Sequence, residues 1–348
     1  MEKRFIDNLI EKIKINKSYV CIGLDPILEG EYKIPQFLID ENYNDPNRTI
    51  LKFNLEIIKA TINLCVVYKP QIAYYEKYNA LDALVKSIEY IHSLNGLVIL
   101  DAKRNDIGST SSAYAYSIFN NFKADATTIN TYFGSDGIIP FLEYKSKGIF
   151  ILLKTSNKSS GEFQDLLALY PKKDSSVKNI EMEFIKSDLY KSLSANQLNQ
   201  IYKILENKFE FIPNYIALAR NILPFIHREL DLIYCSNEIK YSNIGVVVGA
   251  TYPKELKIIR KELPNSFFLI PGYGTQGGTA KDIIYAFNKD GLGAIINSSR
   301  EIDYAYLKPI NGKLYKPEEF AEATKEKTRI MKEEINTELQ TEISLPFY

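Results

Sequence analysis

Short apolar runs alternate with longer amphipathic stretches along most of the chain. Eight of the runs have the length and composition of buried β-strands, and seven of these are followed shortly by a helical pattern. Strands without polar alternation are typical of a parallel sheet covered by helices. Eight strand–helix repeats therefore predict an α/β fold, a (β/α)8 TIM barrel, in preference to an open doubly wound sheet. The predicted strands cover 19–24, 65–69, 96–101, 125–130, 148–153, 245–249, 267–271 and 292–296.

One connection interrupts this rhythm between the fifth and sixth predicted strands. It runs for 86 positions, from 157 to 242, and a barrel crossover needs far fewer. We therefore predict one barrel domain over 1–348, with a helical insertion at 166–241 that includes the fifth crossover helix, and a polar tail at 339–348. A separate domain is the alternative. Helical patterns lie at 49–64, 80–94, 109–122, 179–193, 195–205, 215–230 and 317–338.

Composition and charge narrow the class of protein. Hydrophobic residues make up 45% and charged residues 25% of the 348 positions, which excludes a disordered or fibrous chain. Basic and acidic residues number 43 each, and this balance argues against bulk binding of nucleic acid. The three cysteines have no CxxC spacing, so neither a disulfide framework nor a zinc site is indicated. No apolar run approaches about 18 residues and the amino terminus lacks signal-peptide features, so we expect a cytoplasmic protein without a membrane partner.

The strongest chemical signal is the segment DAKRNDIGST, which begins at Asp101 at the end of the third predicted strand. Active sites of parallel barrels form at the carboxyl ends of the strands. Residues i and i+2 of a strand point the same way, so Asp101 and Lys103 share a face, and Asp106 follows in the loop. A solvated surface cluster is the alternative interpretation. At a barrel strand end, however, such a charged trio costs too much desolvation to serve stability alone.

Neighbouring strand ends add further polar groups. Lys69 ends the second strand, and Asp25 follows the first, where a turn before proline is an equally typical role. Opposite charges nearby favour the ionised form of each group, so Lys103 should be an ammonium. An ammonium is a poor Schiff-base nucleophile but a good general acid or electrostatic stabiliser. Thr155 and Ser156 end the fifth strand and suit hydrogen bonding to a polar ring, although a helix N-cap is equally typical.

The seventh and eighth predicted strands end in a pair of loops typical of phosphate binding. The first is a glycine-rich run, PGYGTQGG, at 271–278, which contains Gln276 and Gly277. The second contains Ser299 and Arg300. Barrels commonly hold a phosphate between these two loops, where glycine lets backbone N–H groups approach and arginine can bind bidentately. The glycine run alone is weak support, but the two loops together predict a phosphate site.

These motifs resemble those of the orotidine 5′-monophosphate decarboxylases. DAKRNDIGST is similar to the DxKxxD signature of that family. GLDP, YKPQ, LLKTSN, VGATYP, PGYGTQGG and INSSR are similar to its accompanying blocks, in the same order. The resemblance covers roughly 5–165 and 242–335 and leaves the insertion unexplained. Relatives in the same suprafamily share the DxKxxD element, but the additional blocks favour the decarboxylase.

The resemblance implies conversion of orotidine 5′-monophosphate to uridine 5′-monophosphate and CO2 without a cofactor or a metal. Loss of CO2 from C6 leaves a carbanion outside the ring π system, so the site must supply charge placed in advance. Lys103 would stabilise that charge and protonate C6, while Asp101 would hold Lys103 beside the substrate carboxylate. The other matched positions are Asp25 and Lys69 for the ribose hydroxyls and the charge network, Ser156 with Thr155 for the pyrimidine, and Gln276 and Arg300 for the phosphate, with Gly277 and Ser299 beside them.

The resemblance also implies partners. Asp106, Ile107 and Thr110 would reach into the site of a neighbouring subunit, which makes the protein a homodimer with two shared sites. The chain shows no orotate phosphoribosyltransferase segment, so any coupling to that activity is expected to involve a separate protein.

Three alternatives remain: two are other enzymes, and the third, from a different class, is not catalytic. A Mg²⁺-dependent sugar-phosphate decarboxylase or aldolase of the same suprafamily would carry a carboxylate where Lys69 stands. A Schiff-base aldolase would use Lys103, which the flanking aspartates disfavour. A non-catalytic nucleotide-binding or scaffold protein would not need the charged positions of the signature, and all of them are present.

Overall fold

The computed structural model describes residues 3–172, 194, 196, 203, 209–231, 241–274, 277–343 and 345–346. The chain falls into two compact units, one formed by 1–156 with 223–348 and the other by 157–222. In the described ranges, no helix combines the length and the apolar character needed to cross a membrane.

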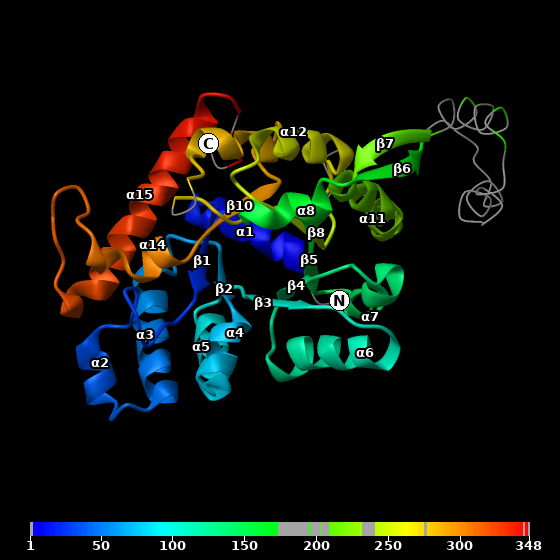
Figure 1. Cartoon of the computed structure of the whole chain (residues 1–348). Coiled ribbons are helices and arrows are strands. Elements are labelled where there is room, and N and C mark those ends of the chain that lie inside the picture. Colours follow the sequence, from blue (N-terminus) through cyan, green and yellow to red (C-terminus); the bar gives the residue numbers. More distant parts are fainter. Residues whose placement is uncertain are drawn as a thin grey trace. The chain divides into compact units, whose positions relative to one another are not determined.

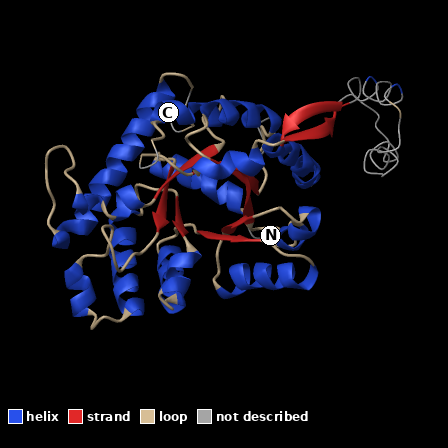
Figure 2. Cartoon of the chain, in the orientation of Figure 1, coloured by secondary structure: helices blue, strands red, loops and turns tan. Residues whose placement is uncertain are grey.

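The first unit contains a closed parallel barrel (Figures 1 and 2). The strands of its sheet are β1 (Val20–Leu24), β2 (Val67–Pro70), β3 (Ile99–Arg104), β4 (Ala126–Ile129), β5 (Gly148–Lys154), β8 (Ile244–Val248), β9 (Phe268–Ile270) and β10 (Ala294–Ser298). In the described part of the chain these eight strands pair in the order β2-β1-β10-β9-β8-β5-β4-β3. Parallel bridges from Tyr68 to Val98 and from Gln71 to Asp101 join β2 to β3 and close the ring. This ring of eight parallel strands confirms the predicted (β/α)8 barrel. The apolar strand pattern predicted it because such strands need cover on both faces.

Helices surround the barrel and follow its strands in sequence (Figure 1). The predicted helices at 49–64, 80–94, 109–122 and 317–338 correspond to α3 (Pro46–Thr61), α5 (Leu81–Ser93), α6 (Gly108–Tyr116) with the π-helix η1 (Ser117–Asn121), and α15 (Phe320–Gln340). The helical elements of the first unit are α1 (Phe5–Asn16), α2 (Gln36–Glu41), α3 (Pro46–Thr61), α4 (Ile72–Lys77), α5 (Leu81–Ser93), α6 (Gly108–Tyr116), η1 (Ser117–Asn121), η2 (Gly134–Gly137), α7 (Ile139–Leu142), α12 (Pro253–Glu262), α13 (Ala280–Ile283), η5 (Ile284–Ala286), α14 (Arg300–Asp303), η6 (Ala305–Leu307), η7 (Pro317–Glu319) and α15 (Phe320–Gln340).

Helix α1 covers the amino-terminal end of the barrel. The Phe5 N–H donates to the Ser146 carbonyl at 2.8 Å, and the Ile6 N–H donates to Asn243 Oδ1 at 3.0 Å. Gly148 makes room for the helix, because a Cβ there would lie 2.4 Å from the Phe5 ring. Because α1 covers this end of the barrel, we expect the functional polar side chains at the opposite end, where the strands have their carboxyl ends.

Helix α15 packs beside α3 through aromatic rings. The Phe53 ring on α3 stacks on Phe320 of α15 at 5.2 Å between centroids and on Tyr304 at 5.7 Å. This stacking anchors the segment that follows β10 against the barrel. Helix α15 continues to Gln340, so the predicted tail at 339–348 begins inside the helix; Leu339 is buried there because it faces the core.

The second unit contains an antiparallel pair of strands that the helical patterns did not predict. β6 (Leu167–Pro171) pairs with β7 (Phe209–Pro213), and η3 (Lys158–Ser160) and α8 (Gly161–Gln164) precede them. Both strands are only five residues long. β6 (LALYP) is apolar but partly exposed, and β7 (FEFIP) contains a glutamate, so neither has the fully buried pattern of the barrel strands. Helix α11 (Asn214–Asp231), which begins in this unit, corresponds to the prediction at 215–230. The helix predicted at 179–193 lies outside the described residues, and of the one predicted at 195–205 only 196 and 203 are described, so both stay predictions, as does the insertion at 166–241.

Candidate active site

A buried carboxylate lies between two lysines at the carboxyl ends of β2 and β3. Lys69 Nζ lies 2.6 Å from Asp101 Oδ2, and Lys103 Nζ lies 2.6 Å from Asp101 Oδ1. Thr128, on β4, donates its hydroxyl hydrogen to Asp101 Oδ1 at 2.8 Å. Asp101 and Lys69 are buried, whereas the Lys103 side chain is 44% exposed. The three charged residues predicted from separate strand ends are thus in contact, and Lys103 is the cation that faces the opening.

The end of β3 is irregular at Lys103. The register between β3 and β4 shifts between Leu100 and Arg104, and Lys103 has φ +47°, in the left-handed region that side chains other than glycine rarely adopt. The Lys103 N–H donates to Thr128 Oγ1 at 3.0 Å, which holds this conformation. Strained backbone of this kind is concentrated at functional sites. The i, i+2 spacing predicted that Lys103 and Asp101 lie on the same face of a regular strand. In the structure the two side chains are in contact, but the strand end that brings them together is bulged.

The electrostatics keep this cluster ionised. Burial raises the pKa of Asp101, but the ammonium groups of Lys69 and Lys103 outweigh it and hold that pKa well below its usual range. Burial lowers the pKa of Lys69, but Asp101 and Asp25 more than compensate and raise it above the usual value. The cluster therefore presents fixed, paired charges at neutral pH.

Asp25 lies close to this cluster, at the end of β1. Its Oδ1 is buried and has no hydrogen-bond partner among the described residues. Burial raises the pKa of Asp25, and the charge of Lys69 and a hydrogen bond from the Ser299 hydroxyl partly offset the rise. The Asp25 N–H donates to Oδ2 of Asp303, a fully buried residue, at 3.2 Å. Asp303 belongs to none of the sequence motifs. The only sequence feature that could have predicted its place at the site is its spacing of three residues from Arg300 in a short helix.

The loops after β9 and β10 contain the predicted phosphate-binding residues. Gly272, Gly274 and Gly277 have φ of +93°, +73° and +90°, which glycine adopts without strain. Gln276 lies outside the described residues, so its predicted role is untested. Gly277 and the Arg300 side chain are exposed at this end, and Ser299 is half-buried. The Arg300 guanidinium lies 5.8 Å from the centroid of the Tyr32 ring.

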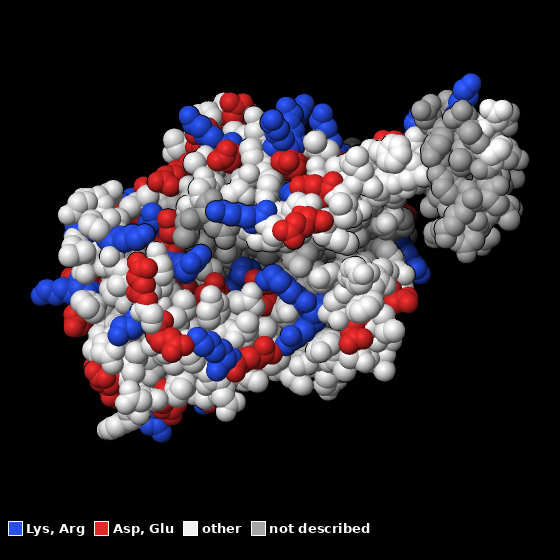
Figure 3. Space-filling view, viewed as in Figure 1, with Lys and Arg blue, Asp and Glu red and all other residues white. Residues whose placement is uncertain are grey.

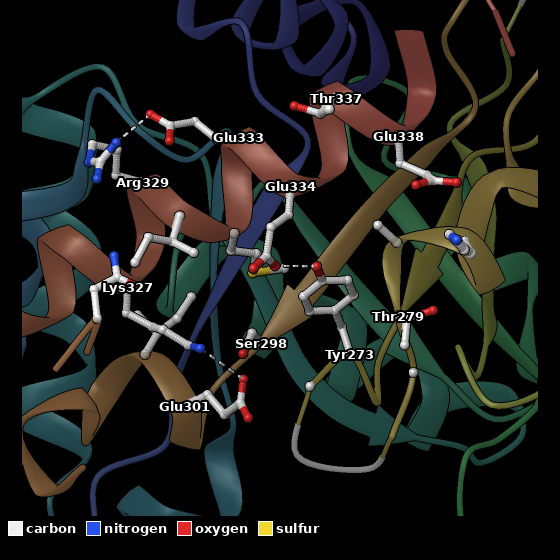
Figure 4. Close-up of a pocket in the computed structure, with 18 residues that line it drawn as sticks. Tyr273, Thr279, Ser298, Glu301, Lys327, Arg329, Glu333, Glu334, Thr337 and Glu338 are labelled. Atoms are coloured by element: carbon white, nitrogen blue, oxygen red, sulfur yellow. Dashed lines mark hydrogen bonds and ion pairs between the residues drawn. The ribbon is translucent and has the colours of Figure 1, made fainter. Parts of the chain in front are cut away.

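A pocket of about 880 Å³ lies between these loops and α15 (Figure 4). The Tyr273 hydroxyl donates to Glu334 of α15 at 2.8 Å. Glu301, which pairs with Lys327 at 3.8 Å, fits against Gly274, where a Cβ would lie 2.1 Å from its carboxylate. The pocket is lined by Ser298 and the loops but not by Asp101 or either lysine of the cluster. It therefore flanks the predicted phosphate loops rather than the charged centre.

Asp106 and Ile107 lie in the loop after β3, and Thr110 lies in the first turn of α6. Asp106 Oδ1 accepts the N–H of Ile107 at 2.8 Å, and within the described part of the chain no hydrogen bond or ion pair joins Asp106 to the cluster. The Ile107 side chain is 53% exposed. Gly137 packs beside this loop, because a Cβ there would lie 2.7 Å from Asn105 Oδ1. The neighbouring segment adds the exposed rings of Tyr132 and Phe133.

Thr155 and Ser156 follow β5 at the same end of the barrel as the cluster, and both are half-buried. Gly249, after β8, contacts Ser156 closely, and a Cβ there would lie 2.9 Å from it. Among the described residues, no three or more His, Cys, Asp or Glu side chains are grouped so that they could hold a metal ion. Acidic and basic side chains are interspersed over the face shown in Figure 3, in keeping with the balanced composition.

The chain is similar to known proteins over nearly its whole length. A family model described as "Orotidine 5'-phosphate decarboxylase / HUMPS family" matches residues 18–185. An orotidine 5′-phosphate decarboxylase of Petrotoga mobilis is 37% identical over 339 residues, which cover 96% of this chain and 98% of the relative. One of Clostridium acetobutylicum is 36% identical over 313 residues, 88% of this chain and 91% of the relative. The structure of Leishmania donovani OMP decarboxylase is similar with a TM-score of 0.66 and 26% sequence identity, and the match covers 97% of this chain and 99% of the Leishmania chain.

Proposed function

The chain belongs to the orotidine 5′-phosphate decarboxylase family and is a carboxy-lyase, and from this premise we propose how its residues act on orotidine 5′-monophosphate. The observation that carries the proposal is the contact of both lysines with Asp101, each at 2.6 Å. This arrangement places a fixed ammonium, Lys103, at the opening of the barrel, with its position set before substrate binds.

The reaction breaks the bond between C6 and the carboxylate, and the electron pair of that bond stays on C6. Lys103 stabilises this developing charge through its ammonium and then donates a proton from Nζ to C6, which gives uridine 5′-monophosphate and CO2. Solvent returns the proton to the amine. Asp101 holds Lys103 in place and lies beside the substrate carboxylate, and Lys69 keeps Asp101 ionised.

The remaining residues bind the substrate. Asp25 and Lys69 bind the ribose hydroxyls, and Thr155 and Ser156 hydrogen-bond the pyrimidine. Gly277, Ser299 and Arg300 bind the phosphate, with Gln276 beside them. Binding energy from the phosphate, remote from C6, can serve the reacting centre as well as affinity.

The protein acts as a homodimer in this proposal. Asp106, Ile107 and Thr110 complete the partner's site. In support, Ile107 and Thr110 are exposed, and no hydrogen bond or ion pair among the described residues joins Asp106 to its own cluster. The exposed side chains of Ile107, Tyr132 and Phe133 support an interface at this end of the barrel. Its location in the cytoplasm stays a prediction.

The decisive test is the fall in ultraviolet absorbance when the purified protein meets orotidine 5′-monophosphate in the presence of EDTA. Release of CO2 in step with that fall is the expected result. A Lys103→Ala preparation, purified in parallel, controls for a contaminating host enzyme. Absence of turnover by a folded dimer, or turnover that appears only with Mg²⁺, would overturn the proposal in favour of the metal-dependent alternative.

A further inference from the structure

Asp303, the last residue of α14, is a carboxyl group buried behind the active site. It has no solvent exposure. Its Oδ2 accepts the Asp25 N–H at 3.2 Å, while its Oδ1 is buried without a hydrogen-bond partner among the described residues. None of the ion pairs formed by the described residues involves Asp303. A buried carboxyl group without a cation is costly, so this one needs an explanation.

The backbone around Asp25 is held from several sides. Tyr304, next to Asp303, donates its hydroxyl hydrogen to the Asp25 carbonyl at 3.1 Å and accepts the Ile27 N–H at 2.7 Å. From α4, the Tyr75 hydroxyl donates to the Leu24 carbonyl at 3.2 Å. Asp303 supplies the remaining contact, on the Asp25 N–H itself. The segment after β1 is thus fixed by groups that come mostly from the far end of the chain.

The described residues leave no cation for Asp303. Lys69 and Lys103 both contact Asp101, and Lys69 also acts on Asp25. Burial raises the pKa of Asp303 well above its usual value and the charge of Asp25 adds to the rise, while the Asp25 N–H and Lys69 act in the opposite direction. Burial without a cation therefore favours the protonated form of Asp303.

We propose that Asp303 is a positioning residue that fixes Asp25 at the sugar-binding end of the site through the Asp25 N–H. Its Oδ2 supplies the acceptor, and in the protonated form it does so without adding a negative charge beside Asp25. The inference rests on the proposed function, because it is Asp25 that is proposed to bind the ribose. It names a residue that touches neither the substrate nor the reacting atoms.

Two substitutions at this position separate the acceptor from the charge. Asp303→Asn keeps a carbonyl oxygen for the Asp25 N–H, so KM for orotidine 5′-monophosphate at pH 7 should stay within about twofold of wild type. Asp303→Leu removes the acceptor and leaves a buried N–H unpaired, so KM should rise about 10-fold while kcat changes much less. Equal KM values in the two variants, or a loss confined to kcat, would overturn the positioning role.

A matched control removes a different hydrogen bond to the same short helix, α14. Thr324 Oγ1, buried on α15, donates to the Ile302 carbonyl at 2.9 Å. Thr324→Val removes one buried hydrogen bond from α14 without touching Asp25, so it should lower Tm but leave KM unchanged. If Thr324→Val raises KM as much as Asp303→Leu, general loosening of α14 explains the effect and the proposal fails.

A second readout does not depend on activity. The pKa of Asp303 is raised in the fold, whereas an unfolded aspartate loses its proton above about pH 4, so this group makes wild-type stability fall as pH rises above that value. Asp303→Asn lacks this dependence, and the Tm of the variant relative to wild type should rise between pH 4 and pH 8. The other titratable groups around Asp25 and Asp303 are common to both proteins: Lys69, Asp101, Lys103, Tyr74, Tyr75 and Tyr304.

A Tm difference that is independent of pH would show that the pKa of Asp303 is not raised in the fold, and would overturn the assignment of a protonated Asp303. The two readouts also separate this inference from the proposed function. If wild type does not decarboxylate orotidine 5′-monophosphate, the proposed function fails, and the role of Asp303 toward the substrate falls with it, whatever the Tm shows. If wild type is active but the KM pattern is absent, only the inference on Asp303 fails.

Discussion

The charged cluster of β2 and β3 and the glycine-rich loops of β9 and β10 are built in opposite ways. In the cluster, Asp101 is buried and paired with both lysines at 2.6 Å. At the loops, Arg300 is exposed and has no ion-pair partner among the described residues, and three glycines have positive φ. In the first region the charged groups are already paired before substrate binds. In the second region the hydrogen-bond donors would gain a partner only when an anion binds.

This difference indicates separate roles in the proposed function. Charges that are fixed in advance act on the developing carbanion and should govern kcat. Donors that an anion completes should govern binding of the phosphorylated substrate. Substitutions in the cluster should therefore slow phosphorylated and unphosphorylated substrates alike, and substitutions in the loops should affect only the phosphorylated one.

The largest effect is expected from Lys103→Ala. It removes the proposed proton donor and the charge that faces C6, so kcat should fall by far more than the roughly 10²–10³ typical of losing one oxyanion donor. Steady-state kinetics on orotidine 5′-monophosphate measure this loss, with Lys86→Ala in an exposed pair on α5 as the control. Near-normal turnover would contradict the assignment of Lys103.

Asp101→Asn should lower kcat by at least about 10²-fold, because Lys103 loses the carboxylate that positions it. The substitution also has a predicted pH signature. The lowered pKa of Asp101 means that its ion pairs add stability above about pH 4, and that this stability is lost as pH falls toward the folded pKa. The Tm gap between wild type and Asp101→Asn should thus close on acidification. A gap that widens at low pH would show that the pairing is not stabilising.

Arg300→Ala should raise KM for orotidine 5′-monophosphate by about 10- to 100-fold, as expected for loss of a charge-assisted hydrogen bond to phosphate. The same variant should process orotidine, which lacks the phosphate, as slowly as wild type does. Comparing kcat/KM for the two substrates tests the contrast between the regions directly. An equal loss of kcat/KM on both substrates would show that Arg300 acts as the charged cluster does and not through the phosphate.

Mixing Asp101→Ala with Asp106→Ala protein tests whether the site is shared. Random exchange makes half of the dimers mixed, and each mixed dimer contains one intact site, so about a quarter of wild-type activity should return. Mass spectrometry of the dimers verifies the exchange. No recovery after proven exchange would confine Asp106 to its own subunit.

The smallest effect is expected from Tyr273→Phe. It removes the hydrogen bond from the glycine-rich loop to Glu334 on α15, worth about 1 kcal/mol, so KM for the phosphorylated substrate should rise a few-fold. Glu334→Gln keeps an acceptor for the Tyr273 hydroxyl and serves as the matched control. A change in kcat on orotidine would contradict a role confined to the phosphate loop.

The order of the strands, the barrel and the pairing of Asp101 with Lys103 were predictable from the sequence, because apolar periodicity and i, i+2 spacing are local properties of the chain. Family membership could be predicted for the same reason, since the signature blocks are short and contiguous. The paired strands at 167–171 and 209–213 were missed because they are short and pair only with each other, outside the strand–helix repeat that identified the barrel strands.

Only the tertiary structure decided the rest. Lys103 adopts φ +47° because the end of β3 bulges against Thr128 on the next strand. Asp303 lies behind Asp25 because closure of the barrel brings β10 beside β1, across 278 positions of sequence. A buried contact over that separation leaves no local pattern, since nothing in the sequence around either residue depends on the other until the sheet closes.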